Sequence, residues 1–323
     1  MLTDAFGRSF HYLRLSVTDV CNYACVYCLP HGYQKPAARE ADLSLEEIER
    51  LVRAFAAIGF WKVRITGGEP TVRRDLIDIV RAARGVSGVR RVALSTNGHG
   101  LRERLDDLID AGLSQLNVSL DALDAVVFAR ITGRDEMAEV KAGVEAAAAR
   151  GLAVKVNAVL MPETVAGFDA FAEWVRALPV TVRFIELMQT QDNGVVFLRQ
   201  RTSAAALRDR LRGEGWALRA RAPGDGPAEE YRRDGFAGGL GIIAAYAPGF
   251  CDTCNRLRVS RTAKLRLCLF GDDALDLRPW LQRDDQQPAL LEAVRAQLRL
   301  KTAAHRLHEG NPGATEHLAA IGG

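Results

Sequence analysis

The chain holds six cysteines in two groups of three, and none is left over. The first group has the spacing C-x3-C-x2-C and comprises Cys21, Cys25 and Cys28. The second has the spacing C-x2-C-x13-C and comprises Cys251, Cys254 and Cys268. Thiols spaced this closely indicate metal binding, because apolar packing of cysteines has no reason to produce such a pattern.

Each group is one ligand short of a complete site, which leaves two interpretations open. A structural zinc site takes four ligands, so His31 or His11 could complete the first group and a carboxylate the second. An iron–sulfur cube is usually held by four cysteines, and with three of them one iron keeps an open position. Such an iron can bind a substrate or cofactor, which predicts catalysis and not only electron transfer.

Two arginines follow the first two cysteines of the second group, in the segment Asn255-Arg256-Leu257-Arg258. On a strand, side chains alternate between faces, so Arg256 and Arg258 share one face. Two guanidinium groups beside an open metal site suit an anionic, phosphate-bearing substrate. A solvated basic face is the simpler alternative.

Composition narrows the class of protein. The 323 residues are 48% hydrophobic and 26% charged, which fits a soluble globular protein and excludes collagen, low-complexity disorder and coiled coil. The net charge of +3 is too small to predict nucleic-acid binding by itself. The sequence shows no signal peptide and no apolar run long enough to span a bilayer. We therefore expect a cytoplasmic protein with reduced thiols.

The elements that must position these groups alternate between strand and helix from residue 10 to about 188. Predicted strands cover residues 12–17, 62–65, 91–95, 115–120, 153–160 and 181–186. Helical segments follow them, and the first begins at a capping box formed by Ser44 and Glu47. Six β-then-α units in a row predict a parallel sheet with right-handed crossovers.

This pattern predicts an α/β fold, an incomplete (β/α)6 TIM-like partial barrel, with a doubly wound open sheet as the alternative. The strands are rich in Val, Ile and Leu, which is typical of strands covered on both faces. Either architecture places ligands at the carboxyl ends of the strands, where the first cysteine group lies. We expect a barrel core over residues 1–195 and a smaller α+β extension with the second cysteine group over residues 196–323.

Several motifs resemble a known superfamily. The first cysteine group with Tyr27 before its third cysteine, and Gly67-Gly68-Glu69-Pro70 after the second strand, resemble radical S-adenosylmethionine (SAM) enzymes. Further features narrow the resemblance to the GTP 3′,8-cyclase family over essentially the whole chain. These are Arg14-Leu15-Ser16-Val17-Thr18-Asp19, the second cysteine group with its arginine pair, and the terminal Gly322-Gly323.

The resemblance implies a lyase with two [4Fe-4S] clusters and SAM as cofactors. Its reaction converts GTP to (8S)-3′,8-cyclo-7,8-dihydroguanosine 5′-triphosphate, the first step of molybdenum cofactor biosynthesis. A 5′-deoxyadenosyl radical abstracts the ribose C3′ hydrogen, and C3′ then bonds to guanine C8.

The resemblance also implies roles for individual residues. The cluster that cleaves SAM would be held by Cys21, Cys25 and Cys28, and the cluster that meets guanine by Cys251, Cys254 and Cys268. Contacts to SAM fall on Tyr27, Gly68, Ser119 and Met188. Contacts to GTP fall on Arg14, Arg64, Ser95, Lys155, Arg256, Leu257 and Arg258. Position 95 is Ser where the family has Thr, which keeps the hydroxyl. The tail formed by Gly322 and Gly323 is expected to reach the active site.

Partners follow from the same resemblance. They are a flavodoxin- or ferredoxin-like electron donor, a downstream cyclic pyranopterin monophosphate synthase and a second copy of the chain in a homodimer. We expect the protein to bind neither nucleic acid nor a membrane. Two other functions stay open on the residues alone. One is a different radical SAM enzyme with an auxiliary cluster, and the other is a zinc-bearing, arginine-rich nucleic-acid-binding module.

Overall fold

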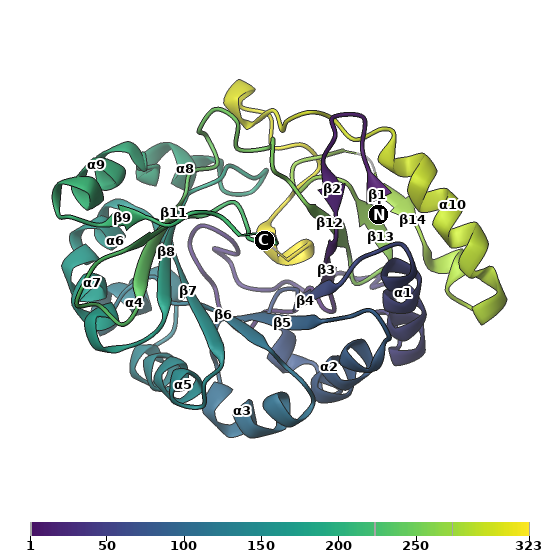
Figure 1. The fold of residues 1–323 in the computed structure, drawn as a ribbon, viewed down its shortest axis with the longest axis horizontal. Helices are drawn as coiled ribbons and strands as arrows, with labels where there is room; N and C mark the ends of the chain where they lie inside the picture. The colour runs from purple at the N-terminus through teal and green to yellow at the C-terminus, as the bar shows by residue number, and fades with distance from the viewer. Residues whose placement is uncertain (1, 223, 273, 323) are drawn as a thin grey trace.

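The computed structural model describes residues 2–222, 224–272 and 274–322, and within these ranges a twelve-stranded mixed sheet forms the centre of the fold (Figure 1). Its six central strands are parallel and adjacent in sequence order: β3 (Tyr12–Ser16), β4 (Lys62–Thr66), β5 (Arg91–Thr96), β6 (Gln115–Ser119), β7 (Ala153–Leu160) and β8 (Thr181–Glu186). The order runs in one direction without a reversal, so the doubly wound alternative is wrong.

The C-terminal part of the chain adds strands to both edges of this sheet. Beyond β8 lie β11 (Gly239–Ile243), β10 (Glu229–Arg232) and β9 (Ala217–Leu218), with β11 parallel to β8. Beyond β3 lie β12 (Arg256–Val259), β13 (Lys264–Arg266) and β14 (Ala274–Asp276), with β12 parallel to β3. A short hairpin of β1 (Leu2–Thr3) and β2 (Ser9–Phe10) stands apart. Strands from both halves of the chain therefore share one sheet.

Helices lie around the outside of the curved sheet (Figure 1). They are α1 (Leu45–Ala57), α2 (Leu76–Gly85), α3 (Leu101–Asp110), α4 (Ala125–Thr132), α5 (Met137–Ala149), α6 (Pro162–Ala166), α7 (Phe168–Ala177), α8 (Gly194–Gln200), α9 (Ala205–Gly213) and α10 (Gln287–Leu298). The predicted capping box is present at Ser44 and Glu47. Between β6 and β7 the helical sequence is divided at Gly133, whose φ of 73° ends α4.

None of the described helices is long and apolar enough to cross a membrane.

The two faces of the sheet differ in chemistry, unlike the expectation of apolar residues on both. In β3, Leu13 and Leu15 are fully buried in the apolar core, whereas Tyr12 and Arg14 line an internal cavity. The other central strands repeat the alternation, as in Lys62-Val63-Arg64-Ile65-Thr66. Because side chains alternate along a strand, the apolar set packs on the outer helices and the polar set faces inward.

Register brings the inward cations into rows across neighbouring strands. One row crosses three strands and consists of Arg258, Arg14 and Arg64. The row nearer the amino ends consists of Arg256, Tyr12, Lys62 and Arg91. The fold thus gathers positive charge inside the sheet, where helices on the outer face cannot neutralise it.

Candidate active site

The first cysteine loop follows β3 and is anchored to the end of α4. The Ala24 amide donates to the Thr132 carbonyl at 3.0 Å, and the Val26 amide donates to the Ile131 carbonyl at 2.9 Å. Within the loop, the Cys28 amide donates to the Cys25 carbonyl at 2.9 Å. These bonds fix the backbone that carries the three thiols.

Burial raises the pKa of the first three thiols, and neighbouring negative groups raise it further. The pKa of Cys21 is raised to about 11 and that of Cys28 to about 12. The pKa of Cys25 is raised well above its usual value. The thiols lie close enough to raise one another's pKa. Such a site keeps its thiols protonated unless a cation compensates the thiolates, as iron does.

The second triad has a more cationic environment. Burial raises the pKa of Cys251, and the neighbouring thiols raise it further. Burial also raises the pKa of Cys254, but Arg256 and Lys301 outweigh it and lower that pKa to about 7. Soft sulfur donors in two partly buried sets fit iron–sulfur clusters.

The side chains of the described residues do not form a ready-made site for a single metal ion. Within the described residues, no three or more His, Cys, Asp or Glu side chains are already arranged as the ligands of a single metal ion. His11, one of the two histidines considered for zinc, stacks on Trp61 with ring centroids 5.0 Å apart. That position is at the amino end of β3, whereas the first cysteine loop follows its carboxyl end. His11 therefore does not complete the first triad.

The Gly67–Pro70 loop packs directly on the first cysteine loop. The Gly68 amide donates to the Thr18 carbonyl at 2.9 Å, and the Glu69 amide donates to the Val20 carbonyl at 2.8 Å. A Cβ atom on Gly67 would stand 2.3 Å from the Thr18 oxygen, and one on Gly68 2.3 Å from the Val20 oxygen. Only glycine allows this approach.

Glu69 ties this loop to the loop after β5. Its buried carboxylate accepts the Thr71 amide at 2.9 Å, the Thr96 hydroxyl at 2.8 Å and the Asn97 amide at 2.6 Å. Burial raises the pKa of Glu69, although these hydrogen bonds oppose the rise. Through these hydrogen bonds, the carboxylate connects the loops at the carboxyl ends of β4 and β5.

Tyr27 and Met188, two predicted SAM contacts, are joined by residues that the sequence did not single out. The Tyr27 hydroxyl donates to Asp121 at 2.8 Å, and burial raises the pKa of Asp121 to about 6. The Asn193 side-chain amide donates to the Tyr27 and Met188 carbonyls, both at 3.0 Å. Ser119 ends β6, two residues before Asp121.

A cavity of about 450 Å³ lies inside the sheet and collects most of the predicted substrate contacts. Its lining includes the second cysteine triad, Met188 and the predicted contacts Arg14, Arg64, Ser95, Lys155, Arg256 and Arg258. Leu257 is different, because it is fully buried in the apolar core of the outer face. Its side chain therefore does not reach the cavity.

The cavity extends toward the amino ends of the strands, which the carboxyl-end rule did not predict. Further lining residues are Tyr12, Lys62, Arg91, Asn117, Asn157 and Arg183. Arg183 donates to the Asn157 side-chain oxygen at 2.6 Å. The signal for these residues was present in the alternation of polar and apolar residues along each strand.

Crowded cations dominate the electrostatics of this cavity. Burial and like charges lower the pKa of Arg14 to about 9 and those of Arg183 and Arg258 to about 10. Tyr12 accepts a hydrogen bond from Arg64. Burial raises the Tyr12 pKa, but Arg64, Arg14 and Lys62 outweigh it and lower that pKa to about 7. The cavity therefore favours anions.

Lys155 already has a carboxylate partner. Its ammonium group pairs with Glu230, which is buried and also accepts from Arg219 at 3.0 Å. Glu230 belongs to β10, at the other end of the cavity wall from the second triad. An anionic ligand must compete with this carboxylate for Lys155.

Comparison with known proteins shows which families the chain matches. Residues 15–175 match the family model of the radical SAM superfamily, and residues 180–307 match Molybdenum Cofactor Synthesis C. The GTP 3′,8-cyclase of Synechococcus elongatus is 51% identical, with 100% of this chain and 99% of the relative covered. That of Aeromonas hydrophila is 49% identical, with 100% and 96% covered.

The chain belongs to the GTP 3′,8-cyclase family.

A solved structure shows the same fold at much lower identity. Streptococcus suis SuiB bound to S-adenosylmethionine superposes with a TM-score of 0.62 at 12% identity, covering 90% of this chain and 68% of SuiB. The α/β fold with a mixed sheet is therefore that of radical SAM enzymes.

The C-terminal tail of this GTP 3′,8-cyclase family member reaches the centre of the ring of strands (Figure 1). Arg14 donates to the Gly322 carbonyl at 2.7 Å, and the backbone of Leu318 and Ala319 lies near the Cys28 thiol, where it opposes the rise of that thiol's pKa. Gly322 has a φ of 70°, and a Cβ there would stand 2.2 Å from the Thr66 side chain. Gly323 lies outside the described residues. The tail thus contacts both the first cysteine loop and the basic cavity.

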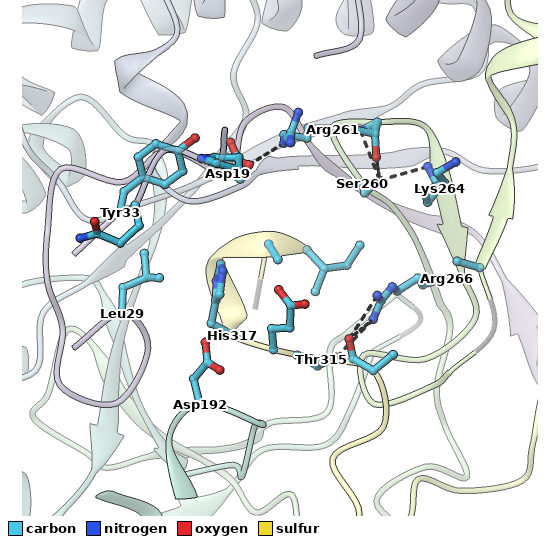
Figure 2. Close-up of a pocket in the computed structure, with 18 of the residues that line it drawn as sticks. Asp19, Leu29, Tyr33, Asp192, Ser260, Arg261, Lys264, Arg266, Thr315 and His317 are labelled. Atoms are coloured by element: carbon cyan, nitrogen blue, oxygen red, sulfur yellow. Dashed lines mark hydrogen bonds and ion pairs between the residues drawn. The ribbon is translucent and has the colours of Figure 1, made fainter. Parts of the chain in front are cut away.

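A second cavity, of about 720 Å³, is lined in part by the tail (Figure 2). Leu29 and His31, which follow the first cysteine triad, line it, as do Ala320 and Ile321 of the tail. Arg261 crosses its rim to Asp19 at 2.7 Å. The tail therefore forms part of the wall of this second cavity.

We expect Gly68→Ala to disturb the first cysteine loop, because the new Cβ collides with two backbone carbonyls. The substitution should cost about 1–3 kcal/mol of folding stability and weaken SAM binding, measured by chemical unfolding and anaerobic equilibrium dialysis. Gly85→Ala is the matched control, since a Cβ there meets open space. Equal SAM affinity in the two variants would contradict the packing argument.

We expect GTP affinity to fall as pH rises through about 7, because Tyr12 then ionises and its phenolate occupies the cations that a triphosphate needs. The lowered pKa means that the phenolate stabilises the ligand-free fold above this pH, and that this stabilisation is lost as pH falls through 7. Binding titrations from pH 6 to pH 9 should show a steeper decline for the parent than for Tyr12→Phe. Parallel curves would contradict this role.

Proposed function

We propose that the protein converts GTP to (8S)-3′,8-cyclo-7,8-dihydroguanosine 5′-triphosphate, the first step of molybdenum cofactor biosynthesis. One observation carries this proposal beyond the family relationship. The basic cavity is lined by the second cysteine triad and by arginines from three neighbouring strands. A nucleoside triphosphate has the anionic charge that such a cavity lacks.

The architecture that we propose is an incomplete (β/α)6 barrel over residues 1–195 with a C-terminal extension over residues 196–323. Sequential parallel strands with helices on the outer face support the barrel. The extension supplies the strands at both edges and the second triad, so it completes the cavity wall.

The two cofactor sites follow from the residues in place. Cys21, Cys25 and Cys28 would hold the first cluster, and SAM would lie against Tyr27, Gly68, Ser119 and Met188. Cys251, Cys254 and Cys268 would hold the second cluster beside guanine. When bound, the first cluster and SAM supply the one-electron chemistry that removes the ribose C3′ hydrogen and lets C3′ bond to guanine C8.

The protein's own residues bind and orient the nucleotide. Arg14, Arg64 and Lys155 are placed to offset the triphosphate charge, and Arg256 and Arg258 flank the second triad. The backbone of Leu257 joins the last two, although its side chain faces the core. Ser95 accepts a hydrogen bond from Arg64 at 3.0 Å, which orients that guanidinium group. Through its contact with Arg14, the tail would help to exclude water from the site, which protects a reactive carbon centre.

The inward direction of the basic residues opposes the nucleic-acid-binding alternative. Arg14 and Arg64 line an internal cavity and do not form an outer face for a phosphate backbone. Identity of 49–51% over the full chain with GTP 3′,8-cyclases likewise outweighs the peptide-modifying alternative.

Partners complete the proposal. A flavodoxin- or ferredoxin-like protein would supply electrons, and a cyclic pyranopterin monophosphate synthase would consume the product. A homodimer and a cytoplasmic location stay predictions of the sequence.

The deciding experiment is an anaerobic reaction with SAM, a reductant and GTP deuterated at C3′. Deuterium should appear in 5′-deoxyadenosine, because the C3′ hydrogen is the one removed. Cys268→Ala should lose GTP turnover but keep SAM binding at the first triad. If the 5′-deoxyadenosine formed during turnover holds no deuterium, the proposed hydrogen transfer is wrong.

A second test concerns the tail. Gly322→Val should push the tail off Thr66 and Arg14 and reduce product formation about tenfold or more, since small misplacements at a reacting centre are costly. Gly213→Val is the control, because a Cβ there meets open space. Normal turnover in Gly322→Val would show that the position of the tail does not affect catalysis.

A further inference from the structure

One buried lysine belongs to none of the contacts that the proposed function uses. Lys301 follows the end of α10 and is 7% exposed. Its ammonium group lies 5.5 Å from the centre of the Phe10 ring, and among the described residues it forms no ion pair with a carboxylate. A buried ammonium group is costly unless a negative group compensates it, so the counter-charge of Lys301 must be sought elsewhere.

The ammonium group of Lys301 is fixed beside the second cysteine triad. It donates to the carbonyl of Leu267, the residue that precedes Cys268. The thiolates of Cys254 and Cys268 are close enough to act electrostatically on the lysine. Two members of the triad are therefore available as its counter-charge.

Arg8 fixes the neighbouring residue to the other arm of the triad. Its guanidinium group donates to the Thr302 carbonyl at 2.6 Å and to the Cys251 carbonyl at 3.2 Å. Asp4 accepts from the same guanidinium group at 2.6 Å and supplies its counter-charge. The charge of Arg8 is therefore balanced locally by a carboxylate, whereas the charge of Lys301 is not.

Lys301 approaches the triad from a different side than the arginines of the proposed GTP site. It lines a separate cavity of about 460 Å³ together with Cys268, and it does not line the basic cavity. Arg256 and Arg258 do line the basic cavity. A triphosphate bound there would draw on these two arginines and would leave the charge of Lys301 to the triad.

We propose that Lys301 is a positioning residue for the second cluster, whose fixed positive charge compensates the thiolates of Cys254 and Cys268 and favours the reduced cluster. Reduction adds negative charge to a cluster, and a nearby cation stabilises that charge. The inference rests on the proposed function, which assigns a cluster to this triad. It gives Lys301 a role that no motif of the sequence indicated.

Two substitutions separate the charge of Lys301 from its hydrogen bond. Lys301→Gln keeps an N–H donor for the Leu267 carbonyl but removes the charge, whereas Lys301→Arg keeps the charge. Arg299→Gln is the matched control, because it removes the same charge from an exposed side chain two residues earlier, where solvent screens it.

The test is a potentiometric titration of the anaerobically cluster-loaded protein, followed by electron paramagnetic resonance, with photoreduced deazaflavin as the one-electron donor. A chain with Cys21, Cys25 and Cys28 all replaced by Ser identifies the signal of the second cluster. Lys301→Gln should make reduction of this cluster about tenfold less favourable, which lowers its midpoint potential by about 59 mV. Lys301→Arg and Arg299→Gln should stay close to the parent.

Iron and sulfide content gives a second readout, which covers a failure of cluster assembly. Loss of the second cluster in Lys301→Gln but not in Lys301→Arg would support the inference, because only the charge differs in the way required. Equal loss in both variants would overturn it, since Lys301 would then only support the backbone.

Three results of the titration would also overturn the inference. They are an unchanged potential in Lys301→Gln, an equal shift in Lys301→Gln and Lys301→Arg, and an equal shift in Lys301→Gln and Arg299→Gln. Failure of the proposed function is distinguishable, because it is seen in the parent. A parent that transferred no deuterium from C3′ could still show the predicted potentials, whereas a parent without iron at the second triad would overturn both proposals.

Discussion

Positive charge gathered inside the sheet is the constraint on which the rest of this structure depends. Parallel register places Arg258, Arg14 and Arg64 side by side on the inner face of the sheet. Charges gathered in a cavity repel one another, and burial adds a desolvation penalty. The ligand-free protein offsets part of this cost with Glu230 beside Lys155 and with the acidity of Tyr12. A triphosphate bound as proposed would add negative charge here and so would relieve a cost already present in the fold.

The same alternation that concentrates charge inside also makes the fold stable. Leu13 and Leu15 point outward to the helices from the strand that carries Arg14 inward. A doubly wound sheet would bury both faces under helices and leave no cavity for an arginine row. Curving the sheet with helices on one face only resolves the conflict. Architecture and electrostatics are therefore two consequences of one sequence pattern.

Much of this could be predicted from local sequence, and the failures have physical causes. Strand and helix positions followed from periodicity, and the cysteine groups identified the metal chemistry. Register could not be predicted, because it depends on contacts between strands far apart in the chain, and so Tyr12 and Lys62 were missed. The pattern Lys62-Val63-Arg64-Ile65-Thr66 was present but was taken as a strand buried on both faces. Asn193 was missed because it only links the backbones of Tyr27 and Met188.

The boundary between the two ligand sites shows why position matters more than residue type here. The proposed hydrogen transfer needs the sugar and SAM in contact, but the basic cavity extends toward the amino ends of the strands, whereas the first cysteine loop lies at their carboxyl ends. A nucleotide bound as proposed would have to span the distance between them. In the proposed arrangement, the nucleotide would lie along the inner wall with its ribose nearest the carboxyl ends of the strands. Arginines supply affinity over that span but hold phosphates, which lie several bonds from C3′. Charge alone gives little control over the orientation of the sugar, because Coulomb attraction depends weakly on angle.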